Sequence, residues 1–210
     1  MMEKTVIRIA CVGDSLTEGH GSSNPSLKSY PAVMQELLGE GFVVRNFGVG
    51  ARTGLKCGFE NDGEKRGYIL EQFYQDSLNF NPHIVFLMFG TNDTKEINRP
   101  YLAEHFENDM RDLARSYMDL PEKATVFLMS APFVSHENWT ICEECNEKDI
   151  LPRIQNLWKT MDVQPVDVHR FTEKHFEFYT EDGVHFNDYG YSRLAAFLTE
   201  KVRNYLNLKK

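Results

Sequence analysis

Residues 5–19 of the chain read TVIRIACVGDSLTEG, and this stretch decides the fold. Its first part, residues 5–12, is almost continuously apolar and rich in β-branched side chains, which is typical of a parallel strand buried on both faces. Gly13 and Asp14, two common turn residues, follow at once. Ser15 then stands at the expected start of a helix. The stretch therefore predicts a strand, a tight turn and a helix, with a serine at the strand's carboxyl end, where ligands bind in open α/β folds.

Four further segments have the character of strands. Two are nearly as apolar as the first and two are weaker; in chain order they are FVVRNF (42–47), HIVFLMF (83–89), ATVFLMS (124–130) and VQPVDV (163–168). Proline cannot donate to a sheet ladder, so Pro165 predicts an edge position for the last strand.

Segments with helical periodicity lie between and after these strands. In them, apolar residues recur at spacings of three and four. The expected helices cover residues 31–38, 68–78, 100–119, 150–160 and Tyr191–Tyr205. Strand–helix alternation of this kind predicts the α/β class, as a three-layer α/β/α sandwich around a parallel sheet.

Bulk composition limits the function. The 210 residues carry a formal charge of −8, which argues against nucleic acid or an anionic membrane as partner, because both attract basic surfaces. No apolar run approaches the roughly 20 residues needed to span a bilayer. The N-terminal MMEKTVIRIACVGDS does not resemble a signal peptide, because Arg8 interrupts its apolar stretch. The expectation is a cytoplasmic protein with a single domain over residues 1–210.

The four cysteines do not suggest a disulfide framework in a chain of this length. Cys11 falls within the first apolar run and is predicted to be buried. Cys142 and Cys145 form a lone C-x-x-C motif. A zinc site there would need two more ligands, for which His136 and Cys57 are the candidates. Two reduced thiols in a polar loop are the preferred interpretation, and no metal is assigned.

Two segments fit neither strand nor helix. Residues 50–67 are polar and glycine-rich, and residues 134–148 form the other unassigned stretch. Each follows a predicted strand, so both are expected at the carboxyl edge of the sheet. We expect these two loops to shape a substrate pocket.

Two motifs carry the residues of a nucleophilic hydrolase. Ser15 precedes a helix whose free N–H groups and dipole favour an oxyanion. The sequence Asp182-Gly183-Val184-His185 places a carboxylate three residues before an imidazole, just ahead of the last helix. In that arrangement the carboxylate can fix the tautomer of the imidazole and leave its other nitrogen free as a base.

Two further motifs supply candidate oxyanion donors. Asn92 lies in GTND after strand 83–89, and its amide can donate to a developing negative charge. Gly48 lies in NFGVG after strand 42–47, where the absence of a Cβ lets an oxygen approach a backbone N–H. Each motif alone is a common turn sequence. A serine, a histidine–carboxylate pair, an amide and a glycine at one predicted edge together indicate an active site.

These blocks resemble those of the SGNH hydrolase family, also called GDSL esterases and lipases. The matching blocks are GDSLTEG, NFGVG, GTND and DGVHFN, in the family's order from residue 13 to 187. The resemblance implies a catalytic triad of Ser15, His185 and Asp182, with no metal or organic cofactor. It implies an oxyanion hole of Ser15, Gly48 and Asn92. It also implies a flavodoxin-like sheet of about five strands, in the order 2-1-3-4-5.

One position departs from the family pattern. Phe186 stands where the family usually has proline after the histidine, so we expect either a looser His185 or an aromatic ring beside the pocket that touches the substrate. Arg52, just past Gly50, is a second candidate substrate contact, because a guanidinium can pair with a carboxylate.

The resemblance also implies ester hydrolysis through an acyl-enzyme. The blocks look most like those of bacterial carbohydrate acetylesterases, including sialate O-acetylesterases, so the expected substrate is a small O-acetylated sugar. A lipid acyl hydrolase of lysophospholipase or thioesterase type, an acyltransferase and a sugar-binding pseudoenzyme stay open. A dinucleotide site, suggested by Gly48-x-Gly50-x-x-x-Gly54, is disfavoured because the pattern is a residue too long and follows the second strand.

Overall fold

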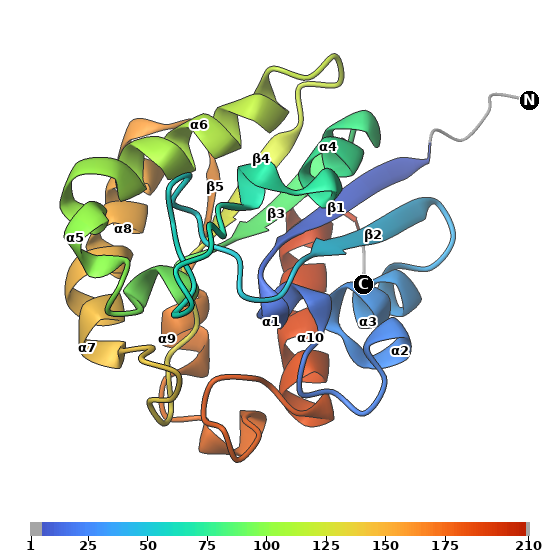
Figure 1. Ribbon diagram of the computed structural model, residues 1–210. Helices are drawn as coiled ribbons and strands as arrows, with labels where there is room; N and C mark the ends of the chain where they lie inside the picture. Colours follow the sequence, from blue (N-terminus) through green and yellow to red (C-terminus); the bar gives the residue numbers. More distant parts are fainter. Residues whose placement is uncertain (1–5, 209–210) are drawn as a thin grey trace, which may run out of the picture.

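The computed structural model describes residues 6–208, so Thr5, the first residue of the predicted strand 5–12, lies outside it. The strands form one parallel sheet in the order β2-β1-β3-β4-β5 (Figure 1). They are β1 (Ile7–Gly13), β2 (Phe42–Gly48), β3 (Ile84–Met88), β4 (Thr125–Met129) and β5 (Gln164–Val166). The predicted parallel sheet and its strand order are confirmed.

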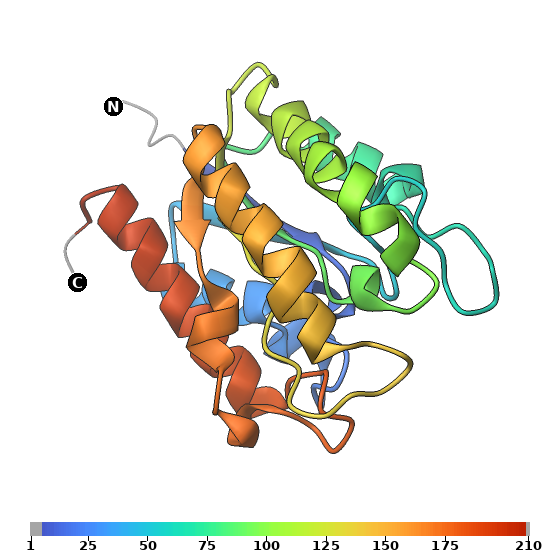
Figure 2. The same cartoon turned by 90° about the vertical axis from the view of Figure 1, so that its left-hand side faces the viewer.

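Helices cover both faces of this sheet (Figure 2). The α-helices are α1 (Ser15–Glu18), α2 (Pro25–Lys28), α3 (Tyr30–Leu38), α4 (Gln72–Asn79), α5 (Arg99–Tyr101), α6 (Glu107–Met118), α7 (Glu143–Cys145), α8 (Leu151–Thr160), α9 (Val168–Thr172) and α10 (Asp188–Tyr205). Short 3₁₀ turns cover Tyr68–Leu70, Asn92–Thr94 and Phe176–Phe178, and π-helical turns cover Leu102–Phe106 and Asn146–Ile150.

Alternation along the strands builds two apolar cores. Successive strand residues point to opposite faces of the sheet. In β1, Ala10 and Val12 pack on the side of α4, α6 and α8, whereas Ile9 and Cys11 pack on the side of α3 and α10. All four side chains are buried. Because both faces are covered, the strand has no polar side, which explains its continuous apolar run and confirms the three-layer prediction.

The bounds of several predicted elements differ from those observed, and in two of them the local structure gives the reason. The strand expected over 163–168 ends before Asp167, because the side chain of that residue caps α9 instead. Pro165 lies within this edge strand, as predicted. The helix expected over 68–78 is divided at Glu71, whose backbone is extended with ψ 147°, so a 3₁₀ turn precedes α4.

The two ends of the parallel strands carry different segments. At the carboxyl edge, α1 follows β1, the Asn92 turn follows β3, and long loops follow β2 and β4. The opposite edge holds the start of β1 and the end of α10 (Figure 2), where the hydroxyl of Tyr205 lies 2.8 Å from Thr125 Oγ1 at the start of β4. Among residues 6–208, no helix is long and apolar enough to cross a bilayer.

Candidate active site

Ser15 occupies the first position of α1, directly after β1. The Asp14 carboxylate caps this helix by accepting a hydrogen bond from the N–H of Leu16 at 2.9 Å. A Cβ on Gly13 would lie 2.2 Å from Thr17 Oγ1, so the turn needs glycine at that position. This sharp strand–turn–helix path sets the Ser15 hydroxyl at the carboxyl edge, as the sequence predicted.

Ser15, His185 and Asp182 form a continuous hydrogen-bonded chain. Ser15 Oγ lies 2.8 Å from His185 Nε2, and His185 Nδ1 lies 2.8 Å from Asp182 Oδ2. A carboxylate can only accept, so the Nδ1–H donates to Asp182 and Nε2 carries the lone pair that accepts the serine proton. The structure thus brings together three residues that the sequence separates by up to 170 positions.

The loop carrying Asp182 and His185 holds the carboxylate in a fixed orientation. Asp182 Oδ1 accepts hydrogen bonds from the backbone N–H groups of Val184 and His185, both at 2.8 Å. Gly183 adopts φ 74° and packs against His136, where a Cβ would lie 2.2 Å from the His136 Cβ. These contacts leave Oδ2 free to orient the imidazole.

The electrostatics of the pair favour a neutral base beside an ionised carboxylate. Burial lowers the pKa of His185 below its usual value, and the Asp182 carboxylate only partly offsets this effect. Burial would raise the pKa of Asp182, but the two backbone N–H groups and the imidazole outweigh it and hold that pKa below its usual value. At neutral pH the imidazole is therefore uncharged and able to take a proton.

Asn92 lies in the 3₁₀ turn after β3 and lines the same cleft as Ser15. Its Nδ2 donates to the backbone oxygen of Arg52 at 3.1 Å and to Asp14 Oδ2 at 3.3 Å. Desolvation raises the pKa of the buried Asp14 to about 7. Because both neighbours are acceptors, they orient the amide with its NH₂ group towards Ser15's turn.

Gly48 does not line this cleft, and the prediction that its N–H serves an oxyanion is wrong. That N–H donates to Asn46 Oδ1 at 2.9 Å. A Cβ on Gly48 would lie 2.2 Å from the backbone nitrogen of Glu18, so glycine is needed there for the close approach of β2 to α1.

The next residues of the same loop line the cleft instead. Gly50 and Ala51 both line the cleft, and their N–H groups donate to none of the described residues. Ala51 adopts φ 60°, a left-handed conformation that is uncommon for a residue other than glycine. The sequence does not indicate this conformation, because alanine rarely adopts a positive φ.

The two candidate substrate contacts are also corrected. The Arg52 guanidinium is committed to Glu71 at 2.5 Å and to the Gly50 backbone oxygen at 2.9 Å, outside the cleft. The Phe186 ring is fully buried between the rings of Tyr179 and Tyr191, so it belongs to the core. Phe186 therefore anchors the segment after His185 rather than touching a ligand.

The cleft beside Ser15 has a volume of about 310 Å³, and both predicted loops contribute to it. Its lining residues are Ser15, Glu18, His20, Gly50, Ala51, Glu60, Thr91, Asn92, Lys95, Trp139, Ile141, Val184 and His185. Lys95, which is buried, pairs with Glu60 at 2.6 Å. The wall is thus polar and charged near Lys95 and aromatic at Trp139.

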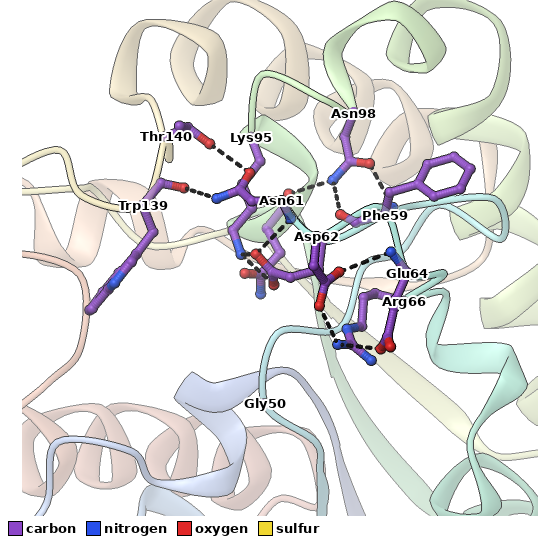
Figure 3. Close-up of polar contacts among 12 residues, drawn as sticks. Gly50, Phe59, Asn61, Asp62, Glu64, Arg66, Lys95, Asn98, Trp139 and Thr140 are labelled. Carbon is purple, nitrogen blue, oxygen red and sulfur yellow. Dashed lines mark hydrogen bonds and ion pairs between the residues drawn. The ribbon is translucent and has the colours of Figure 1, made fainter.

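Buried side chains that the sequence analysis did not single out hold the first loop in place. Asp93 accepts hydrogen bonds from the N–H groups of Gly54 and Leu55. Asn98 bonds both the N–H and the carbonyl of Phe59 (Figure 3). Their partners lie about forty positions away in sequence. No local sequence pattern therefore predicts that these side chains hold the loop.

The C-x-x-C motif has a structural contact of its own. Cys142 Sγ accepts a hydrogen bond from the N–H of Cys145 at 3.4 Å and caps the short helix α7. Burial raises the pKa of Cys145 to about 11, which keeps that thiol protonated. Within the described part of the chain, no group of three or more His, Cys, Asp or Glu side chains could hold a metal ion.

The chain is similar to a curated esterase and to solved structures of esterases. A curated acetylxylan esterase from Xylanibacter ruminicola is 30% identical over 96% of this chain, which spans 44% of that protein. The solved structure of Est24, a carbohydrate acetylesterase from Sinorhizobium meliloti, superposes with a TM-score of 0.76 at 20% identity and covers 95% of this chain and 99% of its own. A Mycobacterium smegmatis aryl esterase gives a TM-score of 0.72 at 22% identity, covering 94% and 99%.

The two solved structures support the fold, and they share it at low sequence identity. A family model matches residues 11–193, a range that begins within β1 and ends within α10. That range contains all four blocks that carry the resemblance, with Ser15, Gly48, Asn92, Asp182 and His185. The chain therefore belongs to the GDSL-like Lipase/Acylhydrolase family.

Proposed function

We propose that the protein is a serine esterase that removes acetyl groups from an O-acetylated carbohydrate. The observation that carries the proposal is the chain of short hydrogen bonds from Ser15 through His185 to Asp182, opening into a cleft. The relative named as an acetylxylan esterase supports acetyl as the acyl group and a carbohydrate as its carrier. The chain spans less than half of that relative, so the proposal concerns the catalytic step alone.

The first half of the reaction forms an acyl-enzyme. His185 Nε2 takes the proton of Ser15 as Oγ attacks the ester carbonyl carbon, and the carbonyl π electrons move onto oxygen. Asp182 stabilises the resulting imidazolium through Nδ1–H. Collapse of the tetrahedral intermediate breaks the bond to the sugar oxygen, which leaves with the proton from Nε2.

The second half regenerates the enzyme. Water attacks the acetyl carbonyl carbon while His185 takes one of its protons, and the new intermediate expels Ser15 Oγ, which recovers that proton. Acetate is the product. An acyltransferase would differ only in that a second alcohol replaces this water, and both versions use the same acyl-enzyme.

Four groups around Ser15 fit the role of oxyanion donors. The N–H of Ser15 is the first of α1 and has no partner within the helix. Among residues 6–208, no acceptor is bonded to the N–H groups of Gly50 and Ala51 beside the cleft. Asn92 also lines the cleft, and an oxyanion there could share the N–H that makes its longer bond, 3.3 Å to Asp14 Oδ2. Preformed donors of this kind stabilise the developing negative charge without rearrangement.

Removing the Asn92 amide tests this part of the proposal. Asn92→Ala should lower kcat for ester hydrolysis by roughly 100- to 1000-fold, which is the usual cost of one oxyanion donor. KM should change little, because the lost contact forms fully only in the transition state. Fluorophosphonate labelling of Ser15 would give the concentration of folded active sites. A variant nearly as active as the wild type would contradict the assignment.

The pH dependence tests the role of His185. A protonated imidazole cannot accept the serine proton, and burial lowers the pKa of this ring. The acid limb of kcat/KM for ethyl acetate should therefore have its midpoint below 6.5, the usual value, and activity should be level at pH 7. Circular dichroism over the same range would separate titration from unfolding. A midpoint above 6.5 would contradict this prediction.

A series of p-nitrophenyl esters from acetyl to octanoyl tests the acyl group. The small cleft, with the Lys95–Glu60 pair in its wall, favours the acetyl ester, because a long acyl chain would desolvate these charges. Activity that peaks at octanoyl would instead indicate a lipid acyl hydrolase. The absence of any turnover would overturn the esterase proposal and indicate a sugar-binding pseudoenzyme.

A further inference from the structure

An exposed tryptophan stands beside the proposed catalytic base. Trp139 belongs to the loop after β4 and lines the cleft together with Ser15 and His185. Its ring centroid lies 5.5 Å from that of His185, with a tilt of 59° between the ring planes. The side chain is 46% exposed, so much of the indole faces solvent at the mouth of the cleft. The indole therefore offers a flat apolar face to a ligand that enters the cleft.

The backbone under this ring is held in a strained conformation. Trp139 and Thr140 have φ of 50° and 63°, and two consecutive left-handed residues other than glycine are costly. Asn61 secures them from the opposite loop: its Nδ2 donates to the Trp139 carbonyl at 3.3 Å, and its Oδ1 accepts from Thr140 Oγ1 at 3.2 Å. Figure 3 shows the indole pointing away from Asn61. Strain of this kind is typical of functional sites.

The charged groups that line the cleft indicate the charge of a ligand that could bind against Trp139. Lys95 donates to both carboxylate oxygens of Glu60, at 2.6 and 2.7 Å, so its charge is already neutralised. Glu18 is exposed on the same cleft and leaves it with an excess negative charge. A carboxylated sugar would be repelled there, whereas the hydroxyls of a neutral sugar can donate to these carboxylates.

We propose that Trp139 is a stacking platform for the sugar ring that carries the acetyl group, and that this sugar is uncharged. One face of a pyranose presents C–H groups that pack on an aromatic π face, while its rim of hydroxyls stays available for hydrogen bonds. The ring would then lie next to His185, with its ester directed at Ser15. This inference rests on the proposed esterase function and adds the recognition of the sugar to it.

The kinetic test compares two acetyl esters, only one of which carries a sugar. The substrates are acetylated xylo-oligosaccharides and ethyl acetate, and the variants are Trp139→Ala and Trp139→Phe. Trp139→Ala should raise KM for the oligosaccharide about 10-fold or more and should lower kcat/KM for ethyl acetate by a much smaller factor, because that ester has no sugar ring to stack. Trp139→Phe should recover part of the lost affinity. An equal loss on both esters, or no loss on the sugar, would overturn the platform.

The charge of the sugar is tested with the wild-type protein. O-acetylated N-acetylneuraminic acid, which carries a carboxylate, should be hydrolysed with a kcat/KM about 10-fold or more below that of the neutral oligosaccharide, because the cleft already holds a net negative charge. Equal rates, or a preference for the acidic sugar, would overturn the proposal of an uncharged ring.

A binding measurement keeps this inference separate from catalysis. The chain has two tryptophans, and Trp158 lies in α8 with its Nε1–H bonded to the Leu128 carbonyl, away from the cleft. In a Ser15→Ala background, acetylated xylo-oligosaccharide should shift the tryptophan fluorescence, and adding Trp139→Ala should abolish that shift. A Trp139-dependent shift in this background, combined with no ester turnover by the wild-type protein, would overturn the esterase and support the platform. Turnover of ethyl acetate by the wild-type protein without a Trp139-dependent shift would support the esterase and overturn the platform.

Discussion

Replacing Ser15 with alanine is expected to lower kcat for ester hydrolysis by about 10⁶-fold, the size of effect seen when a triad hydrolase loses its nucleophile. Within residues 6–208, Ser15 Oγ is the one hydroxyl bonded to His185 Nε2, at 2.8 Å beside the cleft, so it is the atom that the geometry offers for the acyl-enzyme bond. The measurement is p-nitrophenyl acetate hydrolysis, together with loss of fluorophosphonate labelling.

The matched control is Ser26→Ala. Ser26 is exposed on α2, and its hydroxyl donates to Asn24 Oδ1, away from His185. This variant should keep full activity and labelling. Because the Ser15 hydroxyl has a single hydrogen bond in the described part of the chain, to His185, Ser15→Ala should unfold close to the wild-type temperature. Full hydrolytic activity in a folded Ser15→Ala protein would remove Ser15 from the mechanism.

Asp182→Asn is expected to lower kcat by about 10⁴-fold while the fold stays intact. Asp182 Oδ1 accepts two backbone N–H groups, so an asparagine would keep its oxygen there and turn its NH₂ group towards His185. That NH₂ group can only donate, which forces Nδ1 to be the acceptor and places the ring proton on Nε2. The imidazole would then hold the wrong tautomer to take the proton of Ser15.

Asp188→Asn is the control for this change. Asp188 is the first residue of α10, and its carboxylate accepts from the N–H and the hydroxyl of Ser23, without contact to His185. Its activity should stay close to wild type. An Asp182→Asn enzyme with wild-type kcat would show that the carboxylate does not set the tautomer.

The sheet could be predicted because its signal is local. Each buried strand is apolar on both faces, and the loops that follow carry the family's blocks in order. Element ends were less predictable. Asp167 fits a strand by pattern, but its side chain is used as a helix cap, and the extended backbone of Glu71 divides a segment with good helical periodicity.

The site, too, contains residues whose contacts the sequence predicts and residues whose contacts it does not. The spacing of Asp182 and His185 is set within one loop, so the sequence alone indicated their pairing. The roles predicted for Gly48, Arg52 and Phe186 rested on residue type and position. In the structure each of them contacts a different group, which the sequence does not reveal. Arg52 pairs with Glu71, and Phe186 packs between aromatic rings. Such choices depend on competing partners in three dimensions.

The positions of Val6 and Leu208, the ends of the described chain, have a practical consequence. β1 starts, and α10 finishes, at the edge of the sheet opposite the cleft. A bead, a fluorophore or another polypeptide joined at either end would be separated from Ser15 by the depth of the sheet. The mouth of the cleft would stay open to solvent on a tethered molecule, so that even a long polymer chain could reach it.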